Sequence, residues 1–176
     1  MKSILLKFCL ILFLKFAKGK IYWSTVSFTS NQEYVSDFSV KIFNDTDGAT
    51  KLNASGTQLK DLEKSAVTLA AKQTRDVFKI NADSCKLNED TFKNFLAHAI
   101  YADMKEKTNF RFSCPQRKGF FKLEGFVLPS TIPYLDKAFR NIVNGYFEFT
   151  FTIRGKPYGQ KKLLMLIFVK LYGVVR

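Results

Sequence analysis

The stretch YFEFTFTIR at residues 146–154 decides the fold class of this chain. Apolar side chains occupy every second position from Phe147 to Ile153, and the positions between and beside them carry Tyr, Glu, Thr, Thr and Arg. A period of two is typical of a β-strand that buries one face. The stretch therefore predicts a strand with a wall of phenylalanine on its inner face.

Sequence on both sides of this stretch predicts further strands. Downstream, Gly155–Gly159 predicts a turn. The continuously apolar residues Leu163–Val169 predict a strand that is covered on both faces, or that has one face on a pocket. Upstream, alternating apolar residues predict strands at Ser36–Phe43, Ser65–Ala71, Val77–Ala82 and from Gly119 onward. Residues 59–71 also fit a helical period, and we favour the strand.

One segment between these strands has the pattern of an amphipathic helix. Between Asp90 and Lys105, one apolar stripe is formed by Phe92, Phe95, Leu96, Ala99 and Ile100. Asn88 or Asp90 can cap its start. A loop follows the next strand, from Pro129 to Gly145. Several strands with one inserted helix predict a mainly β fold, an antiparallel β-sandwich carrying a helix, in a single domain.

The N-terminal 19 residues have the features of a secretory signal peptide. Lys2 is followed by the mostly apolar residues 4–16, and Ala17-Lys18-Gly19 offers small residues for cleavage. The apolar part is too short to span a membrane, and two lysines interrupt it. We expect residues 20–176 to form the mature domain, secreted and extracellular.

Cleavage at this point changes how the three cysteines are interpreted. Cys9 leaves with the leader, so Cys85 and Cys114 remain on either side of the helix. Two cysteines in a secreted chain predict a disulfide, although two free buried thiols are the alternative. Closing such a loop is worth about 3–4 kcal/mol in the chain-entropy picture. Two thiols and one histidine are too few ligands for a zinc site, so we expect no metal.

The net charge of the chain bears on which classes of partner it can bind. Losing four lysines with the leader lowers the formal charge from +13 to +9. The remaining basic residues are scattered, which argues against nucleic acid as a partner, while peripheral contact with an acidic membrane surface stays open.

Asn44-Asp45-Thr46 and Asn53-Ala54-Ser55 fit the glycan acceptor pattern, and both lie in polar, turn-like sequence.

The cysteine motifs also carry a family resemblance. Asp83-Ser84-Cys85-Lys86 before the helix, Ser113-Cys114-Pro115 after it and Gly145-Tyr146 at an aromatic strand resemble a large family of secreted fly proteins. That family includes the CheA and CheB chemosensory proteins, and the resemblance covers roughly Asp37 to Tyr172. The family is in turn similar to the ganglioside-activator and ML lipid-recognition proteins. The resemblance therefore implies a β-sandwich with an apolar cavity that binds a lipid or hydrophobic semiochemical, with a role in pheromone or taste detection. Many relatives have an additional N-terminal cysteine pair, which residues 22–35 lack.

The aromatic composition suggests where such a ligand would bind. Sixteen of the 19 phenylalanines lie outside the leader, and aromatic side chains suit both a solid core and the wall of an apolar pocket. The residues that we expect to form the cavity wall are Phe147, Phe149 and Phe151, with Phe121, Leu166 and Phe168 opposite them. A cavity of roughly several hundred cubic ångströms would fit a binding protein.

Catalytic motifs are weak in this sequence. His98 is the only histidine, and no nucleophile elbow or phosphate-binding glycine loop is present. We therefore expect a non-catalytic binding protein without a cofactor, whose ligand is a lipid or another hydrophobic small molecule. The alternatives are an extracellular interaction module that meets a receptor without a stored ligand and, less favoured, a secreted hydrolase that uses His98.

Overall fold

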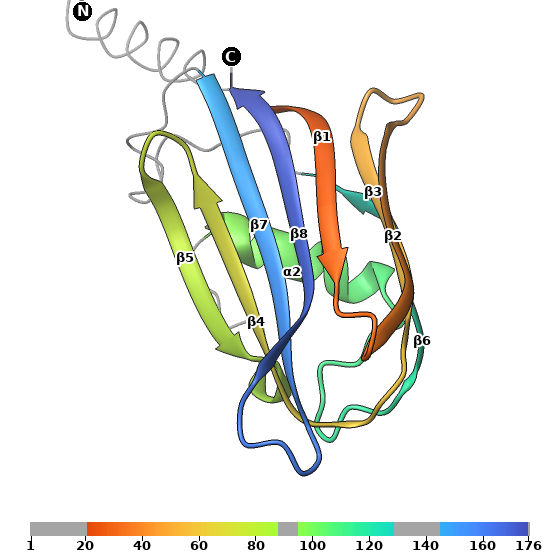
Figure 1. The fold of residues 1–176 in the computed structure, drawn as a ribbon. Helices are drawn as coiled ribbons and strands as arrows, with labels where there is room; N and C mark the ends of the chain where they lie inside the picture. The colour runs from red at the N-terminus through yellow and green to blue at the C-terminus, as the bar shows by residue number, and fades with distance from the viewer. Residues whose placement is uncertain (1–20, 88–94, 129–144, 176) are drawn as a thin grey trace, which may run out of the picture.

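The computed structural model describes residues 21–87, 95–128 and 145–175. These residues form the strands β1 (Ile21–Ser30), β2 (Val35–Asn44), β3 (Thr50–Gln58), β4 (Leu62–Lys72), β5 (Asp76–Asp83), β6 (Gly119–Val127), β7 (Gly145–Pro157) and β8 (Leu164–Val175). Along the chain, β5 is followed by a short 3₁₀ turn, η1 (Ser84–Lys86), and by one helix, α2 (Phe95–Lys107), before β6 begins (Figure 1). The predicted signal peptide, the start of the predicted helix and most of the predicted 129–145 loop lie outside the described residues.

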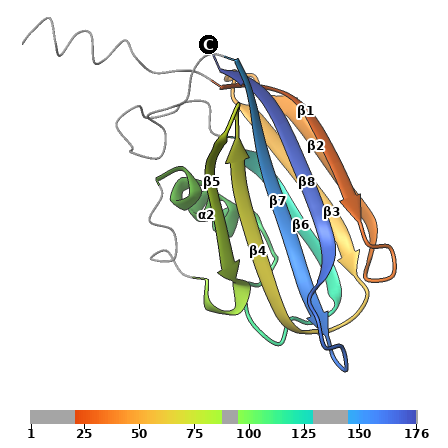
Figure 2. The ribbon, with the colours of Figure 1, turned by 60° about the vertical axis from the view of Figure 1, so that its left-hand side comes forward.

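The strands form two antiparallel sheets that face each other. One sheet has five strands in the order β1-β8-β7-β4-β5, and the other has three in the order β2-β3-β6. Contacts between β1 and β2 join the sheets along one side, and α2 packs against β6. In Figure 2, α2 lies on the side of the molecule away from β1 and β2. The predicted antiparallel sandwich with one inserted helix is confirmed.

Most predicted strands occur within a few residues of their expected bounds. Of residues 59–71, those from Leu62 onward adopt the favoured strand, because β4 pairs with β7 from Leu62 and with β5 from Ala66. The turn predicted to begin at Gly155 begins later, since β7 continues to Pro157. β8 continues to Val175, six residues beyond the predicted strand, because pairing with β1 and β7 on both sides holds it extended.

Strands β1 and β3 have no clear alternation in the sequence. Two inward residues of β3, Ala54 and Gly56, are small, and a Cβ added at Gly56 would lie 2.9 Å from Phe121 Cζ and 3.1 Å from Phe38 Cδ2. The two phenylalanine rings therefore occupy the space that larger β3 side chains would take. Asn53 lies within β3 rather than in a turn, and that part of the sequence-based interpretation is wrong.

The predicted disulfide is present and joins Cys85 of η1 to Cys114 before β6. The Asp83 carboxylate accepts a hydrogen bond of 3.0 Å from the Cys85 N–H and caps η1.

Helix α2 ends at Lys107, two residues beyond the predicted end. Among the described residues, no helix is both long and apolar enough to cross a membrane.

Candidate functional site

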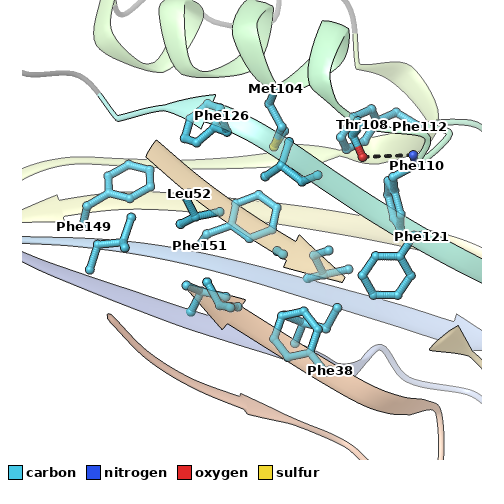
Figure 3. Close-up of a pocket in the computed structure, with 17 residues that line it drawn as sticks. Phe38, Leu52, Met104, Thr108, Phe110, Phe112, Phe121, Phe126, Phe149 and Phe151 are labelled. Carbon is cyan, nitrogen blue, oxygen red and sulfur yellow. Dashed lines mark hydrogen bonds between the residues drawn. The ribbon is translucent and has the colours of Figure 1, made fainter. Parts of the chain in front are cut away.

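An apolar cavity of about 90 Å³ lies between the two sheets. Its walls come from β2, β3, β6, β7, β8, the end of α2 and the residues that follow α2 (Figure 3). The lining side chains are Phe38, Val40, Leu52, Ala54, Met104, Thr108, Phe110, Phe112, Phe121, Leu123, Phe126, Phe149, Phe151, Ile153, Ile167, Val169 and Leu171.

Strands β7 and β8 form the wall on the five-stranded sheet. Their register pairs Phe149 with Leu171, Phe151 with Val169 and Ile153 with Ile167. Side chains of directly paired residues lie on the same face of a sheet, so these pairs form one continuous apolar surface. The period of two at residues 146–154 thus places every second β7 side chain toward the cavity.

Aromatic rings gather at one end of the cavity. We call Phe38, Phe110, Phe112 and Phe121 the aromatic cluster. The Phe110 ring lies 5.1 Å from the Phe112 ring and 5.8 Å from the Phe121 ring, and the Phe121 ring lies 6.3 Å from the Phe38 ring. In Figure 3, Phe38, Phe110 and Phe121 lie at the end of the cavity away from Phe149. All four residues of the cluster are half-buried.

The cavity wall offers almost no polar chemistry. Thr108 is the only polar side chain among the lining residues, and its hydroxyl donates to the Lys122 carbonyl at 2.8 Å. The same oxygen accepts a hydrogen bond of 3.0 Å from the Phe110 N–H. Because these contacts already use the hydroxyl, a guest in this cavity is recognised by its apolar surface and its shape.

Three of the six predicted wall residues line the cavity, namely Phe121, Phe149 and Phe151. Phe147 is buried in the core at the end of the same β7 face, where its ring centre lies 5.9 Å from that of Trp23 in a T-shaped contact. Leu166 is also buried and does not line the cavity. Phe168 alternates with the lining residues Ile167 and Val169, so it lies on the outer face, with the Lys170 amine 5.9 Å from its ring centre.

The expectation that Leu166 and Phe168 stand opposite β7 is wrong. β8 is the neighbour of β7 in the same sheet, and the facing wall comes from β2, β3, β6 and the residues that follow α2. Sequence reasoning missed most of that wall. Two of its members carry a usable signal, because Phe110 and Phe112 alternate within the polar stretch NFRFS at residues 109–113.

The cavity is smaller than expected. Ligand pockets usually measure about 300–1,000 Å³, and an engineered apolar cavity of about 150 Å³ binds benzene. The 90 Å³ observed here accommodates a small apolar group. A longer guest therefore requires the aromatic side chains of the wall to move.

The residues considered for catalysis lie elsewhere. His98 is a half-buried residue of α2 and does not line the cavity. Glu148 forms an ion pair with Lys170 at 3.2 Å, and Glu124 forms one with Lys122 at 2.9 Å. Within the three described segments, no three metal-binding side chains of His, Cys, Asp or Glu come together.

Both glycan acceptor asparagines are exposed. Asn44 ends β2, and its Oδ1 accepts a hydrogen bond of 2.9 Å from the Thr50 hydroxyl. Asn53 Oδ1 accepts one of 2.7 Å from the Gly125 N–H, which links β3 to β6 at the bulge between Leu52 and Ala54. Attachment of glycans at these positions stays a prediction.

A comparison with protein families matches about half of the chain. The family described as "Protein of unknown function (DUF1091)" matches residues 62–149. The matched half of the chain runs from β4 into β7 and contains both cysteines of the disulfide, α2 and β6. Among curated proteins, none matches the chain.

Proposed function

The chain belongs to this family of unknown function, DUF1091, and we propose that it is a non-catalytic protein that binds a lipid or another hydrophobic small molecule between its two sheets. One observation carries the proposal: the space between the sheets is walled by side chains of which all but Thr108 are apolar. Burial is then the binding mechanism, since each methylene group removed from water contributes about 0.8 kcal/mol.

The position of the aromatic cluster supports entry of a longer guest. Phe110 and Phe112 lie on residues 109–113, which belong to no helix or strand. Side chains on such a segment can change rotamer without breaking a strand ladder. Movement of these two rings away from β7 would enlarge the cavity at the end where Phe121 and Phe38 already stand.

The proposal extends to a biological setting. The sandwich with an apolar interior agrees with the resemblance to the CheA and CheB proteins and to the ML and ganglioside-activator proteins. On that basis the chain is a secreted, extracellular carrier or detector of a hydrophobic molecule, with a role in pheromone or taste detection. Delivery of the bound molecule to an extracellular receptor or a membrane surface would complete that role.

Native mass spectrometry of the protein secreted from insect cells tests this function. We expect a hydrophobic mass to co-purify under mild conditions and to be released on unfolding. Repeated absence of any bound mass, together with no uptake of added alkyl compounds, would contradict the proposal. That result would favour an interaction module that meets its receptor through its outer surface.

A further inference from the structure

A second, larger cavity adjoins the apolar one. It has a volume of about 310 Å³, and we call it the basic basin. Its lining residues are Gln58, Asn109, Phe110, Arg111, Ser113, Pro115, Gln116, Arg117, Lys118, Gly119, Phe120 and Phe121. Phe110 and Phe121 line both cavities, so these two rings form the partition between the apolar interior and the basin.

The charge of the basin is positive and only partly neutralised. None of its lining residues is acidic, and three are basic. The Arg117 guanidinium forms an ion pair of 2.9 Å with Asp61, which also accepts a 2.7 Å hydrogen bond from the Lys118 N–H. In the part of the chain that the structure describes, the side chains of Arg111 and Lys118 form no ion pair. The basin therefore presents two cationic groups that are available to an anion.

Gln116 lines the basin and has one buried polar atom without a hydrogen-bond partner among the described residues. Only 6% of the residue is exposed, and its Nε2 donates to the Arg111 carbonyl at 3.4 Å. Its Oε1 is buried and has no hydrogen-bond partner among the described residues. Buried acceptors normally find a donor.

We propose that the basic basin is the head-group subsite for an anionic amphiphile, a carboxylate, phosphate or sulfate on a single alkyl chain. The Phe110 and Phe121 rings are in contact, with their centres 5.8 Å apart, so the tail enters the apolar cavity once the Phe110 ring moves away from Phe121, and the head group meets Arg111 and Lys118. This inference rests on the proposed function, because it names the class of molecule that the same interior would bind. A guanidinium binds such oxyanions through two parallel hydrogen bonds, and the ammonium adds a second positive charge.

The exposure of the basic side chains determines how strongly the basin should prefer an anionic ligand over a neutral one. Arg111 and Lys118 are exposed, so water and salt screen their attraction for the head group. Two such ion pairs predict a preference of about tenfold for an anionic ligand over a neutral one with the same tail. The preference should shrink as salt is raised from about 20 mM to about 500 mM, because the Debye length falls severalfold.

Titration calorimetry with three probes, octyl phosphate, 1-octanol and inorganic phosphate, tests the inference at low salt and pH 7. Octyl phosphate should bind about tenfold more tightly than 1-octanol. The double variant Arg111→Gln/Lys118→Gln should lose this preference and keep its affinity for 1-octanol. The matched control, Lys161→Gln/Lys162→Gln, removes two exposed charges that line neither cavity and should behave as the parent.

The three probes separate the possible failures. Equal binding of octyl phosphate and 1-octanol would overturn the head-group subsite and leave the proposed function standing. Failure of both alkyl probes to bind would overturn the proposed function and this inference with it. Inorganic phosphate binding as tightly as octyl phosphate would identify a site for free anions, and the link to an amphiphile would be wrong.

Discussion

Replacing Ala54 with Leu tests whether guests occupy the apolar cavity. Ala54 is a half-buried residue of β3 that pairs with Val40 on one side and Leu123 on the other, and it lines the cavity. The substitution adds three carbon atoms, on the order of 80 Å³ at protein packing density. The cavity measures about 90 Å³, so the new side chain should fill it.

Stability and binding should respond differently to this change. Burying three carbons stabilises the fold by about 2 kcal/mol, and packing strain of about 1–3 kcal/mol opposes that gain. The free energy of unfolding should therefore change little. A guest that loses the space of three methylene groups should bind about 50-fold more weakly, from about 0.8 kcal/mol per group.

The assay is displacement of a fluorescent apolar probe by 1-octanol, with urea unfolding run in parallel. Ala70→Leu is the matched control, because Ala70 is a half-buried β4 residue whose neighbours Leu69 and Ala71 face inward, which places it on the outer face. This control should bind 1-octanol as the parent does. If Ala54→Leu folds with parental stability and binds 1-octanol equally well, the guest does not occupy this cavity.

Three further predictions concern the frame around the site. Cys114→Ser should lower the free energy of unfolding by about 3–4 kcal/mol and sharply cut the yield secreted from insect cells, whereas normal yield and melting temperature would show that the disulfide is dispensable. The pKa of the Asp61 carboxyl is lowered, first by the hydrogen bond from the Lys118 N–H and then by the one from the Arg117 guanidinium. The ionised Asp61 therefore stabilises the fold above its unfolded-state pKa, and this stabilisation is lost as the pH falls through its folded-state pKa. Acid titration of Asp61→Asn should therefore show a flatter loss of stability below about pH 4 than the parent, and identical curves would contradict this. Gly155→Ala should destabilise the fold by about 1–3 kcal/mol in urea unfolding, because the new Cβ would lie 2.5 Å from Leu166 Cδ1 and 2.7 Å from Leu62 Cδ1; unchanged stability would mean that both leucines move aside freely.

Local periodicity explains why much of the fold was predictable. β7 alternates because its inner face is buried and its outer face carries Thr, Glu and Arg, and β2 and β5 follow the same rule. The disulfide was predictable because the expected leader leaves one possible pair of cysteines. β3 escaped prediction because its inward residue Gly56 is small enough to admit the rings of Phe121 and Phe38, so the strand lacks a regular alternation of large apolar side chains.

The candidate site was predictable only on one side. Phe149 and Phe151 follow from the alternation of β7, which is a local property. Which strand faces them depends on pairing between residues far apart in sequence, and that pairing places β8 beside β7 instead of across from it. The bulge between Ile153 and Arg154 also shifts the register next to Leu166, and periodicity alone does not reveal it. The volume of the cavity depends on how individual rings pack, and composition does not determine that.

The most direct test of the central claim is the measurement of intermolecular nuclear Overhauser effects between a bound alkyl chain and the methyl groups of the protein. With octyl phosphate as the ligand, we expect contacts from the chain to Val40, Leu52, Ile153, Ile167 and Val169, which line the cavity. The exposed Met165 methyl should show none. Overhauser effects confined to Met165 and other exposed methyl groups, with none to the five inward residues, would contradict binding between the sheets.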